Sequence, residues 1–229
     1  MSIKIPPKGK VIVVGDIHEH TEQLDRLLSA VTLSPEMILV SVGDIYEKGF
    51  GTQAAETIVN KFRVLSKMGL AYVVVGNQEL KCIHLAKRNK KMTKCLSWLN
   101  KQPISITFEF YNRTRLVVLH GGIKPTHKME DLYTDVEICY VRNLDKHNNL
   151  IKNNSSKGKI WLELYDGRFG YIASGHNAQK DGAPKFYNYS CNLDLAVYHT
   201  GRLGAQIFSA AGKENFLMFE GQAKYPGSD

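Results

Sequence analysis

The chain has 229 residues, 43% of them hydrophobic, so it can bury a core of its own, and we expect one domain spanning residues 1–229. The formal net charge of +8 favours polyanionic partners such as nucleotides or RNA. The four cysteines form no CxxC pair and no apolar run is long enough to span a membrane, so the composition argues against a disulfide framework and a membrane protein, and we expect a cytoplasmic location.

Short β-branched runs alternate with longer amphipathic stretches in the first half of the chain. The runs at 11–14, 37–42 and 71–75 predict strands, and the periodic stretches at about 21–31 and 52–68 predict helices between them. This alternation predicts an α/β fold with a largely parallel sheet that is covered on both faces.

The second half of the chain is richer in strand patterns. A polar stretch at 146–159 predicts an exposed loop, and no linker separates the two halves. The predicted strands of this half are 105–110, 115–120, 170–176, 184–190, 204–210 and 215–220.

Each of the first three predicted strands ends in a glycine followed by a short polar residue. These polar residues are Asp16, Asp44 and Asn77. The carboxyl ends of parallel strands meet at one edge of a sheet, which is where α/β proteins bind ligands, and the glycines would allow the backbone to turn tightly there. We therefore expect two carboxylates and an amide to converge at this edge.

Three histidines extend the pattern. His18 follows Asp16 by two positions, whereas His120 and His176 end later predicted strands. Carboxylate, imidazole and amide donors without thiolates suit two divalent ions of the Mn, Fe, Ni or Zn type, which Asp44 would bridge at a separation of about 3.5–4 Å. Such a pair would lower the pKa of a shared water, supply hydroxide near neutral pH and neutralise charge on a phosphoryl group. Any one of these residues alone would be an ordinary turn or core residue, but the ordered set predicts a dinuclear site.

The motifs GDIH, GDIYEKG, GNQE, LHGG and SGH resemble, in order, the five signature blocks of the calcineurin-like metallophosphoesterases. The resemblance is to the compact branch that holds lambda phage phosphatase, bacterial diadenosine tetraphosphatase and the phosphoprotein phosphatases. It implies a layered α/β/β/α sandwich and a metal-dependent hydrolase that acts on phosphate esters or anhydrides. It also implies the following metal ligands: Asp16 and His18 for the first ion, Asp44 as the bridge, and Asn77, His120 and His176 for the second ion.

Three residues depart from the family pattern on the side of the substrate. Gln78 replaces the histidine that protonates the leaving oxygen, Glu47 replaces the aspartate that orients that histidine, and Lys48 replaces an arginine that holds phosphate. Loss of a general acid costs ~10²–10⁴-fold, and glutamine cannot deliver a proton near neutral pH. With Asp44, Gln78 and Glu47 as the candidate catalytic group, we expect a dinucleoside polyphosphate, a nucleotide anhydride or a diester as the substrate. A replacement acid could come from other histidines, each of which we expect to be an ordinary loop or surface residue: His20, His84, His127 and His199.

Four residues are candidates to hold the substrate phosphate: Lys48, Asn77, Arg142 and Arg168. Each arginine could equally be a solvated surface charge, although family members place an arginine between the last two metal-binding histidines. Two alternatives to the preferred function stay open. One is a phosphatase that acts on phosphoprotein or RNA-end monoesters, and the other is a catalytically weakened scaffold that binds a partner.

Overall fold

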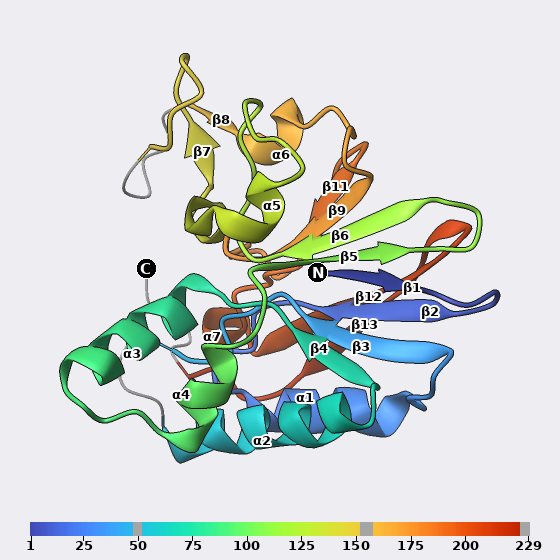
Figure 1. Ribbon diagram of the computed structural model, residues 1–229. Helices are drawn as coiled ribbons and strands as arrows, with labels where there is room; N and C mark the ends of the chain where they lie inside the picture. The colour runs from blue at the N-terminus through green and yellow to red at the C-terminus, as the bar shows by residue number, and fades with distance from the viewer. Residues whose placement is uncertain (48–51, 152–157, 225–229) are drawn as a thin grey trace.

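The structure, a computed structural model, describes residues 1–47, 52–151 and 158–224. Two β-sheets pack face to face, and helices cover the outer face of each sheet, so the molecule has four layers in the order α/β/β/α (Figure 1). The layered α/β/β/α sandwich expected from the sequence is therefore confirmed.

The first sheet has five strands in the order β13-β12-β2-β3-β4. Its strands are β2 (Lys10–Val14), β3 (Met37–Ser41), β4 (Ala71–Val73), β12 (Arg202–Ser209) and β13 (Gly212–Glu220). The three early strands are parallel, as predicted, and β12 and β13 extend the sheet in antiparallel pairing beyond β2.

Two amphipathic helices connect the parallel strands. Helix α1 (Thr21–Ala30) buries Leu24 and Leu27, and helix α2 (Gln53–Lys67) buries Ile58 among others. Both helices lie on the outer face of the first sheet (Figure 1). The other face of this sheet packs on the second sheet rather than on further helices, so both faces are covered, but by different partners.

The second sheet has six strands in the order β1-β5-β6-β9-β11-β10. Its strands are β1 (Ser2–Lys4), β5 (Ser105–Glu109), β6 (Arg115–Leu119), β9 (Tyr171–Ser174), β10 (Lys185–Phe186) and β11 (Ser190–Asn192). Strand β1 was not predicted, because it pairs with β5, more than a hundred residues away. The segment at 184–190, predicted as one strand, holds β10 and the start of β11, which pair with each other in antiparallel fashion.

Short elements cover the outer face of the second sheet. They are α5 (Asp131–Thr134), the 3-10 helix η1 (Val136–Cys139), α6 (Trp161–Leu164) and the small pair β7 (Asn143–Leu144) and β8 (Lys159–Ile160). The fully buried Trp161 packs with Ile172 of β9 in this layer. Strands β7 and β8 flank the polar stretch predicted as a loop, of which residues 152–157 lie outside the described residues.

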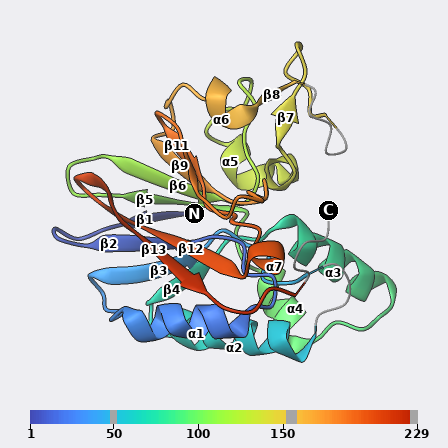
Figure 2. The same ribbon diagram turned by 180° about the vertical axis from the view of Figure 1, so that it is seen from behind.

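Three further helices lie near the carboxyl ends of the parallel strands (Figure 2). They are α3 (Asn77–Arg88), α4 (Lys94–Leu99) and α7 (Val197–Thr200). None of the helices in the described ranges is long and apolar enough to cross a membrane.

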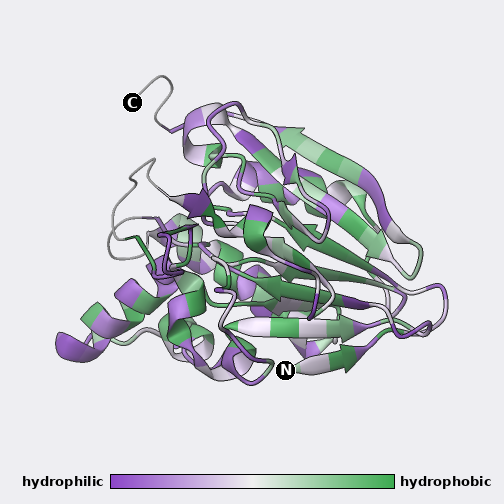
Figure 3. Ribbon diagram, turned by 90° about the horizontal axis from the view of Figure 1, so that it is seen from above, coloured by the Kyte–Doolittle hydropathy of each residue, from purple (hydrophilic) through white to green (hydrophobic). Residues whose placement is uncertain are grey.

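The alternation of side chains along β2 explains why the sheets stack. Val11 and Val13 face the second sheet, whereas Ile12 and Val14 face the helices. Hydrophobic colour in Figure 3 follows the strands, and hydrophilic colour gathers on outer helices and turns. Strand β2 pairs with β3 in the first sheet, and β6 pairs with β9 in the second. Because the two sheets stack, the loops that follow these strands meet at one edge of the sandwich.

Candidate metal centre and active site

Asp44 belongs to two groups of candidate metal ligands. The ligand atoms of Asp16, His18 and Asp44 all lie within 4.8 Å of one another, and so do those of Asp44, His120 and His176. Asn77 joins the second group, because its Oδ1 lies 2.9 Å from Nε2 of His120. The structure thus brings together all six residues that the sequence nominated as ligands.

Backbone carbonyls orient two of the histidines. Nδ1 of His18 lies 3.1 Å from the carbonyl oxygen of Tyr46, and Nδ1 of His120 lies 3.1 Å from that of Val42. A carbonyl can only accept, so each Nδ1 donates its hydrogen to the carbonyl, and each ring turns Nε2 towards the cluster. This is the orientation that a metal-binding histidine needs.

Electron-pair donors crowd around Nε2 of His120. It lies 2.9 Å from Oδ1 of Asn77, 3.1 Å from Nδ1 of His176 and 3.2 Å from Oδ1 of Asp44. Two carbonyl-type oxygens and two imidazole nitrogens have few protons to share between them. A divalent cation suits this donor set, which contains no thiolate.

Four carboxylates are buried around the cluster, each at most 2% exposed: Asp16, Asp44, Glu79 and Asp194. Burial, together with the charges of Asp194 and Asp44, raises the pKa of Asp16 well above its ordinary value. Burial opposes the charge on Asp44, but the imidazoles of His120, His18 and His176 together hold the pKa of Asp44 below its ordinary value. Buried carboxylates are normally paired or bound to metal, so this concentration of negative charge favours cations.

The backbone is strained at three of the ligand positions. His18, Asp44 and His176 have φ angles of 42°, 47° and 66°, in the left-handed region of the backbone that residues other than glycine rarely adopt. Such residues cost of order 1–3 kcal/mol each and persist only where the surrounding structure holds them. Strain collected on ligands marks this edge as a functional site.

Glu79 holds the strained Asp44 loop and was not among the residues nominated from the sequence. Its Oε2 accepts the amide hydrogens of Asp44 and Gly76 at 2.8 and 2.9 Å, and its Oε1 accepts that of Tyr46 at 3.0 Å. The backbone amide of Gln78 in turn donates to Oδ1 of Asp44 at 2.9 Å. The last residue of the GNQE motif therefore positions the carboxylate shared by both ligand groups.

Glycine is needed near the cluster for two different reasons. Gly43 has φ of 100°, which fits the tight turn expected from the sequence. Gly76 has an ordinary φ of −92°, but a Cβ there would lie 2.2 Å from Oδ1 of Asp44, and one on Gly175 would lie 1.8 Å from Oδ1 of Asp16. The last two glycines therefore leave space for the carboxylates, which the sequence reading did not foresee.

The family model of calcineurin-like phosphoesterases matches residues 9–203, a span that contains every ligand described above. The chain belongs to the calcineurin-like phosphoesterase family. Members of this family are hydrolases that bind divalent metals, and both clusters that contain Asp44 lie within the matched span.

Solved structures agree with this assignment. A structure of a putative diadenosine tetraphosphatase is 28% identical, with a TM-score of 0.75, and the match covers 96% of this chain and 98% of that one. A serine/threonine phosphatase from Saccharomyces cerevisiae (13% identity, TM-score 0.58, covering 99% and 85%) and a metallophosphoesterase from Sphaerobacter thermophilus (17%, 0.56, covering 93% and 89%) share the fold. None of the curated proteins matches the chain.

The two arginine candidates for phosphate binding have different surroundings. Nε of Arg142 donates to the carbonyl of His176 at 3.0 Å, and its Nη2 lies 3.5 Å from Nδ1 of the same residue, so Arg142 borders the cluster. The guanidinium of Arg168 instead pairs with Asp166, and its Nη2 donates to three loop carbonyls, those of Lys124, Pro125 and His127. Arg168 is thus occupied in tying a loop together, and Lys48 lies outside the described residues.

Glu47 is engaged by a lysine far along the chain. Nζ of Lys224 lies 3.2 Å from the carboxylate of Glu47 and 3.0 Å from that of Glu19, which is 7% exposed as a whole residue. Gln23 fixes the approach of this segment, because its side-chain amide donates to the carbonyl of Gln222 at 3.4 Å. Lys224 therefore links the loop that follows His18 to the loop that follows Asp44.

Two more residues near the cluster were missed. Asp194 follows β11, and burial raises its pKa. The ring of Tyr198 meets the His18 ring edge to face, with centroids 5.1 Å apart. Asp194 carried a usable signal, since it is again a carboxylate just after a strand, but Tyr198 and Lys224 carried none.

The other histidines give little support to a replacement acid. Nδ1 of the buried His20 lies 2.7 Å from the carbonyl of His18, and Nδ1 of His127 accepts the amide hydrogen of Lys124 at 3.2 Å.

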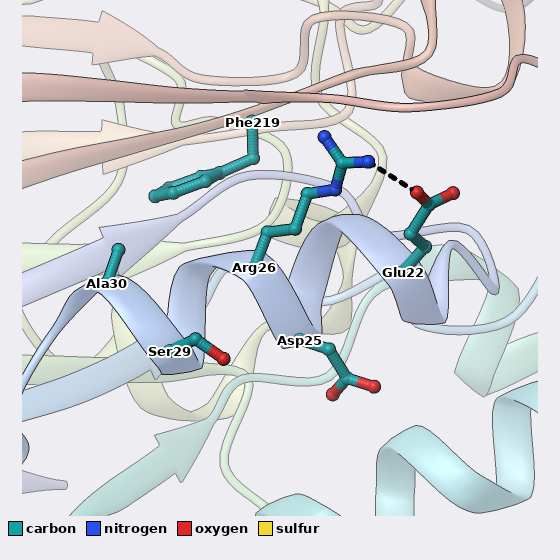
Figure 4. Close-up of a pocket in the computed structure, with 6 residues that line it drawn as sticks. All are labelled: Glu22, Asp25, Arg26, Ser29, Ala30 and Phe219. Atoms are coloured by element: carbon teal, nitrogen blue, oxygen red, sulfur yellow. Dashed lines mark hydrogen bonds and ion pairs between the residues drawn. The ribbon is translucent and has the colours of Figure 1, made fainter.

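A hollow on the outer face of α1, between that helix and Phe219, holds none of the candidate ligands, and its Arg26 pairs with Glu22 at 2.7 Å (Figure 4).

Proposed function

We propose that this protein is a dinuclear metal-dependent phosphoesterase. Asp16, His18 and Asp44 would hold one ion, and Asp44 with the three residues Asn77, His120 and His176 would hold the other. The observation that carries the proposal is the position of Asp44 in both ligand groups, because a shared carboxylate is what a two-metal site requires.

The donor set limits the choice of metal. Oxygen and imidazole donors without thiolates suit Mn, with Fe, Ni or Zn as further candidates. When bound, the ions would activate a water and neutralise the developing charge on the phosphoryl group. The protein would contribute a fixed orientation of the ligands through Glu79 and a guanidinium, that of Arg142, at the border of the cluster.

Phosphate anhydrides and diesters are the substrates we propose, and a dinucleoside polyphosphate or other nucleotide anhydride is preferred among them. Gln78 cannot protonate a basic alkoxide, and the Glu47 carboxylate is occupied by Lys224. Leaving groups of low pKa need no proton. The 28% identity to a putative diadenosine tetraphosphatase over nearly the whole chain supports the same substrate class.

The test is a substrate panel assayed with Mn, Ni, Mg and Zn. It contains diadenosine polyphosphate, a bis-aryl phosphate, an aryl monophosphate and an alkyl monophosphate. We expect hydrolysis of the first two to exceed that of the alkyl monoester by ~10²-fold or more, because a missing general acid penalises the poorest leaving group most.

Two results would redirect the proposal. Fastest turnover of the alkyl monoester, or of phosphoprotein or RNA ends, would favour the monoesterase alternative and would require a proton donor other than Gln78. Complete inactivity with every metal would favour the partner-binding scaffold, for which the Glu47–Lys224 pair is the supporting observation.

A further inference from the structure

A groove of about 700 Å³ lies at the end of the sandwich opposite the metal ligands. The turn between β5 and β6 and the turn between β12 and β13 line it, and both turns lie side by side in Figures 1 and 2. Arg115 begins β6 at the groove, whereas His120 follows the other end of that strand. At about 3.3 Å per residue, the groove is roughly 15 Å from the cluster, so it is a separate site.

The charge of the groove is positive. The cationic residues that line it are Arg113, Arg115, Lys213 and Arg168, the last of which is already bonded to Asp166 and to loop carbonyls. None of the lining residues is an aspartate or glutamate. Arg113 and Arg115 are exposed, and neither makes an ion pair within the described residues. Glu109 stands opposite Arg115 in the register of β5 and β6, but no ion pair joins them among these residues.

Aromatic faces lie between the cationic groups. Tyr189 lines the groove and is 49% exposed, with its ring packed over Gly167, where a Cβ would lie only 2.7 Å from the ring. Nζ of Lys213 lies 5.1 Å from the ring centre of Tyr171 and 4.9 Å from that of the exposed Phe186. Cationic groups and aromatic rings are therefore neighbours in and beside the groove.

The two sheets hold the groove in shape. The side-chain amide of Asn112, in the β5–β6 turn, donates to the carbonyl of Ala210, in the β12–β13 turn, at 2.8 Å. The first of these turns belongs to the six-stranded sheet and the second to the five-stranded sheet. A ligand in the groove would not have to order these two turns when it binds.

We propose that this groove binds single-stranded nucleic acid. Backbone phosphates would contact Arg113 and Arg115, and an unpaired base would stack on Tyr189. Single strands fit this arrangement better than a duplex, whose bases present no free faces to an aromatic side chain. The net charge of +8 adds long-range attraction for such a ligand. This binding does not depend on the proposed hydrolysis.

The test measures fluorescence anisotropy of labelled single-stranded oligonucleotides, one of DNA and one of RNA, with the full chain in EDTA. The double variant Arg113→Ala/Arg115→Ala is compared with Lys67→Ala/Lys101→Ala, which removes two exposed lysines elsewhere. We expect the first variant to bind roughly tenfold or more weakly and its salt slope to fall by about 1.4, at ~0.7 per phosphate contact. The lysine control should bind like the unaltered protein.

A second variant separates stacking from charge. Tyr189→Ala should weaken binding by roughly 5–150-fold without changing the salt slope. Unchanged metal-dependent hydrolysis of an activated diester, or an unchanged circular dichroism spectrum if the chain is inactive, shows that the variants fold. Tighter binding of RNA than DNA, or the reverse, identifies the natural strand.

Three results would overturn the proposal. The first is failure of the unaltered protein to bind either strand at about 50 mM salt. The second is equal weakening by both double variants, which would mean that binding depends on charge spread over the whole surface. The third is an unchanged affinity in Tyr189→Ala together with competition by polyglutamate as strong as that by the oligonucleotide, which would mean that the groove binds negative charge and does not recognise bases.

Discussion

The backbone amide of His176 donates to the carboxylate of Asp16, with the nitrogen 3.2 Å from both carboxylate oxygens. Asp16 follows β2 of the five-stranded sheet, and His176 follows β9 of the six-stranded sheet. This contact therefore joins ligand-bearing loops of the two sheets. The geometry of the candidate metal centre depends on how the sheets pack, and not only on the motif that carries each ligand.

Gly175→Ala should damage the metal centre at this junction. The new Cβ would lie 1.8 Å from Oδ1 of Asp16, so the carboxylate must move. We expect lower metal content by mass spectrometry and a loss of hydrolysis. Gly69→Ala is the control, because its φ of 72° carries backbone strain while the surrounding space is open. Normal metal content in Gly175→Ala would show that Asp16 is not a ligand.

Asp44→Asn should abolish the two-metal site while keeping the left-handed backbone, which asparagine tolerates. Because Asp44 belongs to both ligand groups, we expect bound metal to fall for both ions and hydrolysis to fall by more than the ~10–100-fold typical of residues that only orient ligands. Asp131→Asn is the matched control, since Asp131 only accepts the amide hydrogen of Lys128 near the surface. Two tightly bound ions in Asp44→Asn would contradict a bridging carboxylate.

Divalent metal should raise the melting temperature. The buried carboxylates repel one another without cations, and a ligand at a hundredfold excess over its dissociation constant stabilises the folded state by about 2.7 kcal/mol. For a chain of this size the shift would be roughly 5–10 °C. Differential scanning calorimetry with and without Mn measures it, and no shift with Mn, Zn or Ni would argue for the scaffold.

Gln78→His should increase turnover of alkyl monoesters and change that of diesters little. The gain is at most ~10²–10⁴-fold, and we expect less, because the Glu47 carboxylate is held by Lys224. Adding Glu47→Asp should raise turnover beyond the product of the single effects, since an acid and the group that orients it act as a unit. Purely multiplicative effects in this double-mutant cycle would mean that position 47 does not orient position 78.

His127 should make the stability of the metal-free protein depend on pH. Burial lowers its pKa, despite Asp135, Asp131 and Glu137 nearby, and Lys124 acts in the same direction as burial. As the pH falls below about 6.5, His127 is protonated in the unfolded chain before it is protonated in the folded protein. The free energy of unfolding therefore decreases from its value at neutral pH until the pH reaches the lower pKa of His127 in the folded state.

The measurement is urea unfolding in EDTA at about pH 7.5 and about pH 5.5. His127→Gln should lose less stability than the unaltered protein between these two values. The other histidines are the same in both proteins, so the difference reports His127. Equal losses would mean that the pKa of His127 is the same in the folded and unfolded chain.

Local patterns predicted an α/β fold and the strand ends that carry five of the six nominated ligands, whereas the α/β/β/α layers were implied only by the family resemblance. The β-branched runs and the polar residues that stop them are local patterns, and parallel strands place such ends together. His18 was the exception, since it follows Asp16 in a loop rather than ending a strand of its own. That residues 1–229 form one domain stays a prediction.

The remaining features depend on contacts that no local pattern encodes. Strand β1 pairs with β5, more than a hundred positions away, and Lys224 reaches Glu19 across 205 positions. Arg168 looked like a phosphate ligand because of its place between His120 and His176, but three loop carbonyls occupy its Nη2. Charge and order along the chain suggest which residues are available, whereas tertiary packing decides how they are used.

The pairing of β2 with β12 has a consequence during translation. The ribosome makes β12 about 190 residues after β2, which at ~5–20 residues per second is a delay on the order of 10–40 s. Throughout that time one edge of the KVIVV strand lacks its native neighbour and is open to pairing with other chains. The loops that carry Asp16 and Asp44 are therefore held by the complete five-stranded sheet only after β12 has been synthesised, whichever metal is present in the cell.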